Sequence, residues 1–199
     1  MQNKSTAKNK AGLSSWLAWA IIAALAFLVM KFEFPIIPMI PYLKMDFSDV
    51  IIVLSTFIFG PLGGTMVALF KCLLSYLISG ANILSLVGDL AAFFASMSFA
   101  LPIYYISKRD EKSNGRKIWG IVVGIICLTI VMSVLNAFVL TPMYIKFSGF
   151  KLQAGMLNYI FTAIVPFNLA KGLVNGILVF ILMKTVMPQL EKYAARRFN

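Results

Sequence analysis

Apolar residues in this chain occur in long runs and do not alternate regularly with polar ones. Several runs approach or exceed the roughly 20 residues that a helix needs to cross about 30 Å of hydrocarbon. Short breaks rich in proline, glycine or charge separate them. The pattern predicts an all-α integral membrane protein with six transmembrane helices, at about 14–34, 47–59, 65–78, 83–106, 118–140 and 159–187. We expect one transmembrane domain over residues 14–188, between basic tails at 1–13 and 189–199.

The segment between the first two predicted spans, residues 35–46, is irregular and yet apolar, and we call it the lid segment. Pro35, Pro38 and Pro41 lack a backbone donor and push the preceding residue toward extended geometry, so no helix continues through it. Most of its other side chains are too apolar for a loop that lies free in water. The sequence therefore predicts a cover over a ligand, with Tyr42 and Lys44 near its end.

Composition supports a membrane protein and excludes some kinds of site. Apolar residues make up 60% of the chain and charged residues 13%, and the mean hydropathy is +0.88. The chain has no histidine, so histidine-based metal sites and histidine general bases are excluded. Cys72 and Cys127 lie inside apolar runs, and they predict neither a disulfide nor a metal site. No phosphate-binding motif occurs, so ATP-driven action would need a partner.

The net charge of +11 predicts topology and not nucleic-acid binding. Most cationic residues lie in the two tails and in the loop at 107–117, all on one side of a six-span arrangement. The opposite side has only Lys31, Lys44, Lys146 and Lys151. By the positive-inside rule both termini are cytoplasmic, and the lid segment and the connection at 141–158 are external.

Polar residues within the spans are the candidate binding groups, because a charge at the bilayer centre costs at least about 2.5–3.5 kcal/mol. Asn168, Lys171 and Asn175 follow one another at spacings of three and four residues and share a helical face. Asn136 lies at a comparable depth in the fifth span. With Lys44 and Asp46, these groups are expected to converge under the lid segment. The alternative is structural, with the asparagines bonding between helices and Lys171 in an ion pair.

A second polar group, Asp49, Lys71 and Asp89, is interpreted as structural, with Lys71 paired to one of the two carboxylates. Ser75 follows Lys71 by four residues, but no breaker or glycine-rich context exposes it as a protease nucleophile.

Small residues recur along the first span. Ala20 and Ala24 form a small-xxx-small pair that allows a second helix to approach closely. The spacing by itself leaves packing within this chain and packing against a partner equally open.

Two motifs resemble a known family. They are the stretch from Phe34 through Asp46-Phe-Ser-Asp49, and the stretch Phe59-Gly-Pro-Leu-Gly-Gly64. Together with the Asn168-Leu-Ala-Lys171 face, they resemble the riboflavin-specific substrate-binding (S) components of energy-coupling-factor (ECF) transporters. The similarity extends over essentially the whole chain.

The resemblance implies an ECF S-component fold and a high-affinity riboflavin binder in the bacterial plasma membrane, not an enzyme. Riboflavin is then cargo and not a cofactor, and it is bound near the outer face. The implied partners are membrane lipid, a transmembrane coupling subunit and two ABC-type ATPases, with Ala20 and Ala24 docking on the coupling subunit. The substrate-binding residues expected are Tyr42, Leu43, Lys44, Met45, Asp46, Asn136, Asn168, Lys171 and Asn175.

Several alternatives stay open at this point. An S component for another vitamin or precursor would share the fold and differ in its pocket. A stand-alone membrane transporter or an integral membrane enzyme would act without ATPase partners. Lys44 and Asp46 alternatively form only a surface ion pair, worth under about 1 kcal/mol.

Overall fold

A computed structural model describes residues 3–37, 40, 42–110, 113–152, 155–186, 188 and 189, without the side chains of residues 3–14. Pro38, Pro41 and the predicted tail from residue 190 onward lie outside the described residues. The first half of the described chain contains helix α1 (Asn3–Met30), strands β1 (Phe34–Pro35) and β2 (Lys44–Met45), and helices α2 (Ser48–Ile78) and α3 (Ile83–Ser107). The second half contains α4 (Asn114–Leu135), the π-helical turn η1 (Asn136–Leu140), α5 (Thr141–Ser148), α6 (Met156–Tyr159), the π-helical turn η2 (Ile160–Ile164) and α7 (Val165–Thr185).

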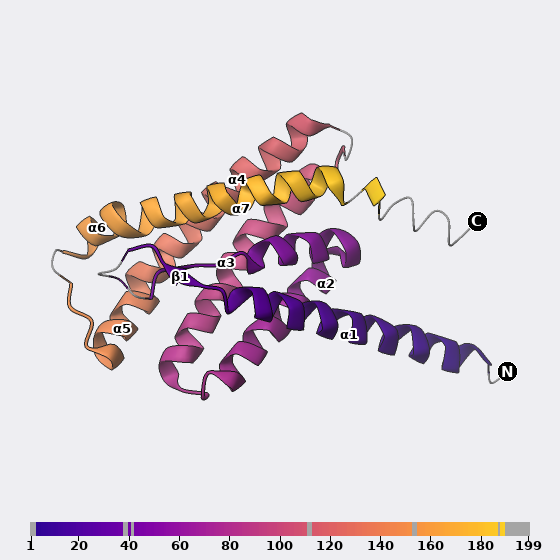
Figure 1. Cartoon of the computed structure of the whole chain (residues 1–199), viewed down its shortest axis with the longest axis horizontal. Helices are drawn as coiled ribbons and strands as arrows, with labels where there is room; N and C mark the ends of the chain where they lie inside the picture. The colour runs from indigo at the N-terminus through magenta and orange to yellow at the C-terminus, as the bar shows by residue number, and fades with distance from the viewer. Residues whose placement is uncertain are drawn as a thin grey trace.

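The chain folds as an elongated helical bundle in which α3 packs against α2 and α4, and α7 packs against α4. The start of α1 and the end of α7 lie at one end of the bundle, and β1, α5 and α6 lie at the other (Figure 1). Interlocked apolar side chains such as Phe99, Ile103, Leu128 and Val179 fill the core. Within the part of the chain that the structure describes, four helices are long and apolar enough to cross a membrane, at Ser48–Ile78, Ile83–Ser107, Asn114–Ser148 and Met156–Thr185, and Ser15–Met30 is a shorter apolar helix.

Helix α2 reverses direction within its bounds, at Gly60. This residue has φ 79° and ψ 176°, which a side chain disfavours. The Lys71 Nζ lies 3.0 Å from the Ser48 Oγ, whereas a straight helix would separate these positions by about 35 Å. A Cβ on Gly64 would fall 2.0 Å from the Thr56 Oγ1. The break predicted at 60–64 is therefore a hairpin between two closely packed helical segments.

Three predicted boundaries differ in the structure. The first helix ends at Met30 and not at 34, and its backbone is helical from Asn3, within the predicted tail. The helix predicted to end at 140 continues to Ser148, because the π-helical turn η1 leads directly into α5, which has Pro142 in its first turn. The last span starts at Met156, before the predicted 159, and passes through η2 just before Pro166. A π-helical turn shifts the bonding from i−4 to i−5 and accommodates the missing proline donor.

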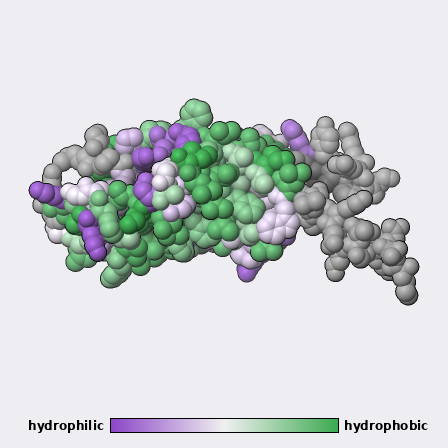
Figure 2. All heavy atoms as spheres, turned by 90° about the horizontal axis from the view of Figure 1, so that it is seen from below, coloured by the Kyte–Doolittle hydropathy of each residue, from purple (hydrophilic) through white to green (hydrophobic). Residues whose placement is uncertain are grey.

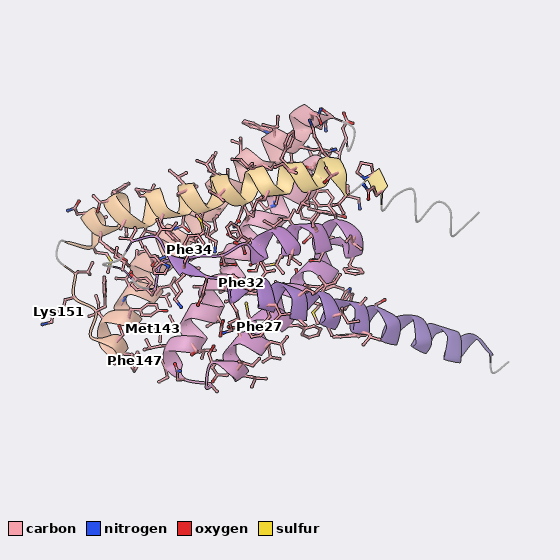
Figure 3. All side chains as sticks on the ribbon, viewed as in Figure 1. Phe27, Phe32, Phe34, Met143, Phe147 and Lys151 are labelled. Carbon is pink, nitrogen blue, oxygen red and sulfur yellow. The ribbon has the colours of Figure 1, made fainter. Side chains whose placement is uncertain are left out.

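The surface of the bundle is largely apolar, as expected of side chains that face lipid. Figure 2 shows hydrophobic residues over most of the visible face, with hydrophilic residues more frequent toward the end that carries the strands. Phe32 and Phe34 near β1 and Phe147 on α5 are exposed at that same end (Figure 3).

Candidate binding site

A cavity of about 430 Å³ opens beneath the lid segment. The end of α1, the lid segment, the end of α2, the first half of α3, and the facing sides of η1, α5 and α7 contribute to its wall. The volume is in the range of small-molecule sites. The predicted lid does cover a cavity: Ile40 and Leu43 are buried against the helix face that presents Tyr159, Ile164 and Phe167.

At the base of the lid segment its two ends pair with each other, and Asp46 bonds the start of α2. β1 and β2 pair antiparallel, with Phe34 opposite Met45, which adds a small strand pair to the fold predicted as all-α. Beyond β2, the backbone N–H of Ser48 donates to the Asp46 Oδ1 at 2.9 Å, and the Ser48 hydroxyl bonds the same oxygen. These bonds hold the Asp46 carboxylate over the start of α2.

A buried charge network lies directly under the lid. The Lys171 Nζ lies 2.8 Å from the Asp46 Oδ2 and 3.3 Å from the Asp49 Oδ2. Lys71 Nζ lies 3.9 Å from the other Asp49 oxygen and donates to Ser48 and Ser96. Burial would raise the pKa of the Asp46 carboxyl, but the ammonium groups of Lys171 and Lys71 hold that pKa well below its usual value.

This network corrects two sequence-based interpretations. Lys71 and Asp49 do form a pair, but the pair is joined to the lid through Lys171 and Ser48 and is not a separate structural group. Asp89 is outside this network. The suggested Lys44–Asp46 surface pair is wrong, because Lys44 pairs with Glu33 at 2.5 Å on an exposed part of the cavity wall.

Two buried asparagines face the cavity from helices broken by π-helical turns. The Asn136 Nδ2 donates to the Met132 carbonyl, and the Asn168 Nδ2 donates to the Ile164 carbonyl, each at 2.8 Å. The buried Asn136 Oδ1 has no hydrogen-bond partner among the described residues. Each amide is therefore anchored within its own helix, and the Asn136 oxygen is left for another donor. These two bonds stay within one helix each, so they do not support the alternative in which the asparagines bond between helices.

An aromatic cluster closes the side of the cavity nearest to α5. Tyr42 stacks on Tyr144 with ring centroids 4.1 Å apart and planes 9° apart, and Phe150 meets Tyr42 edge-on at 5.4 Å. The Tyr42 hydroxyl also bonds Tyr159. Burial raises the pKa of the Tyr42 hydroxyl above its ordinary value. This wall is flat, apolar and hydrogen-bonded at its rim.

The structure brings most of the predicted binding residues together. The predicted residues that line the cavity are Tyr42, Leu43, Lys44, Asp46, Asn136, Asn168 and Lys171. Met45 and Asn175 are not among the described lining residues. Met45 is buried in β2, and the Asn175 Nδ2 donates to the Asp46 carbonyl at 3.2 Å.

Other lining residues were not singled out from the sequence as binding groups. They include Ser75, Ser79, Ser85, Gly88, Asp89, Ala92, Ala95, Tyr144 and Phe150. Gly88, Ala92 and Ala95 recur at helical spacing next to Asp89. A stripe of small residues beside an intramembrane carboxylate could have identified this wall from the sequence, since small side chains leave room for a ligand.

The arrangement suits reversible binding of a flat, mostly apolar molecule with polar edges. Ring faces, amide oxygens and an ammonium group surround the space, a combination typical of ligand pockets. Within the described residues, no group of three or more His, Cys, Asp or Glu side chains is placed to hold a metal ion.

Comparisons with known proteins identify the family. The model of the "ECF transporter, substrate-specific component" family matches residues 18–183. The chain belongs to this family. It is 42% identical over 165 residues to "Riboflavin transporter RibU" of Staphylococcus aureus (strain TCH60), which covers 82% of this chain and 85% of that protein. It is 31% identical over 175 residues to "Riboflavin transporter FmnP" of Bacillus subtilis (strain 168), with 87% and 92% covered.

A solved structure agrees with this assignment. The S component described under "Structure and mechanism of the S component of a bacterial ECF transporter" superposes with a TM-score of 0.73 at 38% identity. The match covers 90% of this chain and 98% of that one. The chain is thus a multi-pass membrane protein with the ECF S-component fold, and it is a transport component and not an enzyme.

Proposed function

We propose that this chain binds riboflavin at the outer face of the bacterial plasma membrane, as the substrate-specific subunit of an ATP-driven ECF importer. The observation that carries this proposal is the covered cavity with the Asn136 and Asn168 amides and Lys171 in its wall. Relatives at 42%, 34% and 31% identity are named riboflavin transporters, which supports the choice of vitamin. Riboflavin is bound as substrate, and no cofactor is required.

The polar edge of the flavin ring has both carbonyl acceptors and an imide donor. We propose that Lys171 and the two asparagines bind that edge, since an ammonium donates and a free amide oxygen accepts. Tyr42 and Leu43 cover the ring from the lid segment, and Lys44 lies at the rim. Asp46, Met45 and Asn175 contribute by holding the lid and Lys171 in place.

The helical segments supply six membrane spans in this proposal. Counting the two arms of α2 separately gives spans at 15–30, 48–59, 61–78, 83–107, 114–148 and 156–185. The basic loop between α3 and α4 and both termini are then cytoplasmic, because arginine and lysine concentrate there. The lid segment faces the outside.

The exposed face of α1 is proposed to dock on the transmembrane coupling subunit. Ala20 and Ala24 are exposed, whereas Ala23 and Ala26 are buried within this chain. The small-residue pair therefore faces outward and permits a close helix–helix approach. Two ABC-type ATPases attached to the coupling subunit would power uptake.

The deciding experiment is an absorption and fluorescence spectrum of the protein purified in detergent, followed by titration with riboflavin. A yellow preparation, or saturable quenching of added riboflavin, is the expected result. A colourless protein that leaves riboflavin fluorescence unchanged would contradict riboflavin as the substrate and make other vitamins the candidates. Uptake of riboflavin into vesicles by this chain without ATPases would contradict the subunit role.

A further inference from the structure

A second polar cluster, at the end of α2 and the start of α3, lines the cavity. Ser75 and Ser79 lie at the end of α2, and Ser85 and Asp89 lie in the first two turns of α3. Asp89 forms none of the salt bridges found among the described residues. The cluster therefore has a carboxylate and three hydroxyl groups that the binding of a ring edge does not use.

Asp89 is the notable member of this cluster. Its side chain is only 6% exposed, and its Oδ2 has no hydrogen-bond partner among the described residues. Ser75 is its hydrogen-bonding neighbour. A buried carboxylate oxygen without a donor is costly, and each such atom in a native fold requires an explanation. Because Asp89 lines the cavity, a hydrogen-bond donor on a bound molecule would explain the unpaired oxygen.

The cluster and the asparagines lie at different distances from the charge network. Asp89 is seven residues before Ser96, which donates to the Asp49 Oδ1 at 2.5 Å. Seven residues of helix span about 10 Å, whereas Asn168 is about 4.5 Å along its helix from Lys171. Asp89 thus lies about two helical turns along α3 from the point where α3 meets the network. A ligand that reaches both Lys171 and Asp89 needs a polar extension beyond its ring.

We propose that Asp89, with Ser75, Ser79 and Ser85, binds the hydroxyl-bearing chain of the substrate and selects a neutral chain over a phosphorylated one. This inference rests on the proposed riboflavin binding and adds the residue that recognises the ribityl chain. A carboxylate is a strong acceptor for hydroxyl donors, and each serine both donates and accepts. A phosphate ester at the end of the chain would meet the buried negative charge of Asp89.

Lys31 also lines the cavity and would attract a phosphate. Its Nζ donates to the Ser79 Oγ at 3.3 Å and lies over the Phe27 ring. However, Lys31 is exposed, so water and salt screen its charge more than that of Asp89. We therefore expect a phosphate at this position to be repelled on balance.

The test compares Asp89→Ala with the wild type, using riboflavin and lumiflavin, which has the same ring system with a methyl group in place of the ribityl chain. Loss of a hydrogen bond to a charged acceptor predicts that riboflavin binds Asp89→Ala about tenfold or more weakly. Lumiflavin binding should change less than about twofold, because it lacks the chain. Asp110→Ala, at an exposed aspartate of the α3–α4 loop, is the matched control and should bind both ligands as the wild type does.

Several results would overturn the inference. Equal losses for both ligands in Asp89→Ala would give Asp89 a structural role only. Equal affinity of the wild type for riboflavin and flavin mononucleotide would exclude selection against phosphate, and this measurement needs no variant. Absence of flavin binding by the wild type would instead overturn the proposed function itself.

Discussion

The Lys171 Nζ and the Asp46 Oδ2 lie 2.8 Å apart although 125 positions separate the residues in the chain. The bond joins the lid segment to α7, and both side chains are buried. Asp49 and Lys71 extend it into α2. The closed position of the lid therefore depends on charges that lie inside the bundle.

Breaking this network should destabilise the protein far more than breaking the exposed ion pair on the same loop. Lys171→Met leaves Asp46 and Asp49 buried without their shared cation, and loss of one partner of a buried pair costs about 3–5 kcal/mol. Lys44→Met removes the exposed bond to Glu33, worth about 0–1 kcal/mol. Thermal unfolding of the ligand-free variants in detergent measures the difference. Similar midpoints for the two variants would contradict the structural role assigned to Lys171.

The same network predicts a dependence of stability on acidity. The folded protein holds the pKa of Asp46 below its usual value, so the carboxylate form stabilises the fold. That contribution is present above the unfolded pKa of about 3.9 and is lost as the pH falls toward the lower folded pKa. Asp46→Asn lacks this titration. The difference in unfolding midpoint between the wild type and Asp46→Asn should stay constant from about pH 7 to 5 and shrink below about pH 4. A difference that stays constant down to about pH 3 would refute this account.

Asn168→Ala should weaken riboflavin binding and leave the fold intact. Its amide bonds only its own helix in the described structure, so truncation removes a ligand partner at little cost to packing. A lost hydrogen bond predicts an affinity decrease of about threefold to tenfold. Fluorescence quenching measures it, with Asn158→Ala, an exposed asparagine of α6, as control. Unchanged affinity would assign Asn168 a purely structural role.

A bulky side chain on the α1 face should separate binding from transport. Ala20→Trp or Ala24→Trp enlarges an exposed small position, so riboflavin binding is expected to persist while ATP-driven uptake into cells with the complete transporter falls to background. Leu173→Trp, at an exposed leucine of α7, controls for a large lipid-facing residue and should leave uptake unchanged. Normal uptake by both alanine variants would rule out docking through this face.

Some features of the fold and of the binding site could be predicted from the sequence, and others could not. Lys171 and Asn168 stood out because charged and amide groups inside apolar runs are costly, and the lid segment stood out through its prolines. The break at Gly60 was visible, but that the two arms pack face to face was not, since it is revealed by contacts between the arms, such as Thr56 against Gly64. The sequence left open whether Asp49 or Asp89 pairs with Lys71, because periodicity does not tell which neighbouring helix a side chain faces; the structure pairs Lys71 with Asp49.

The sequence by itself determined that this protein is a predominantly helical membrane protein with an apolar, proline-rich cover, because span length, hydropathy and proline act locally along the chain. The π-helical turns around Asn136 and before Asn168, the stacking of Tyr42 on Tyr144 and the partner of each buried charge were decided only by the tertiary structure. These features depend on contacts between different helical segments and on how each helix is rotated. A pair such as Lys171 and Asp46 forms only once the helices have packed and excluded water around both charges.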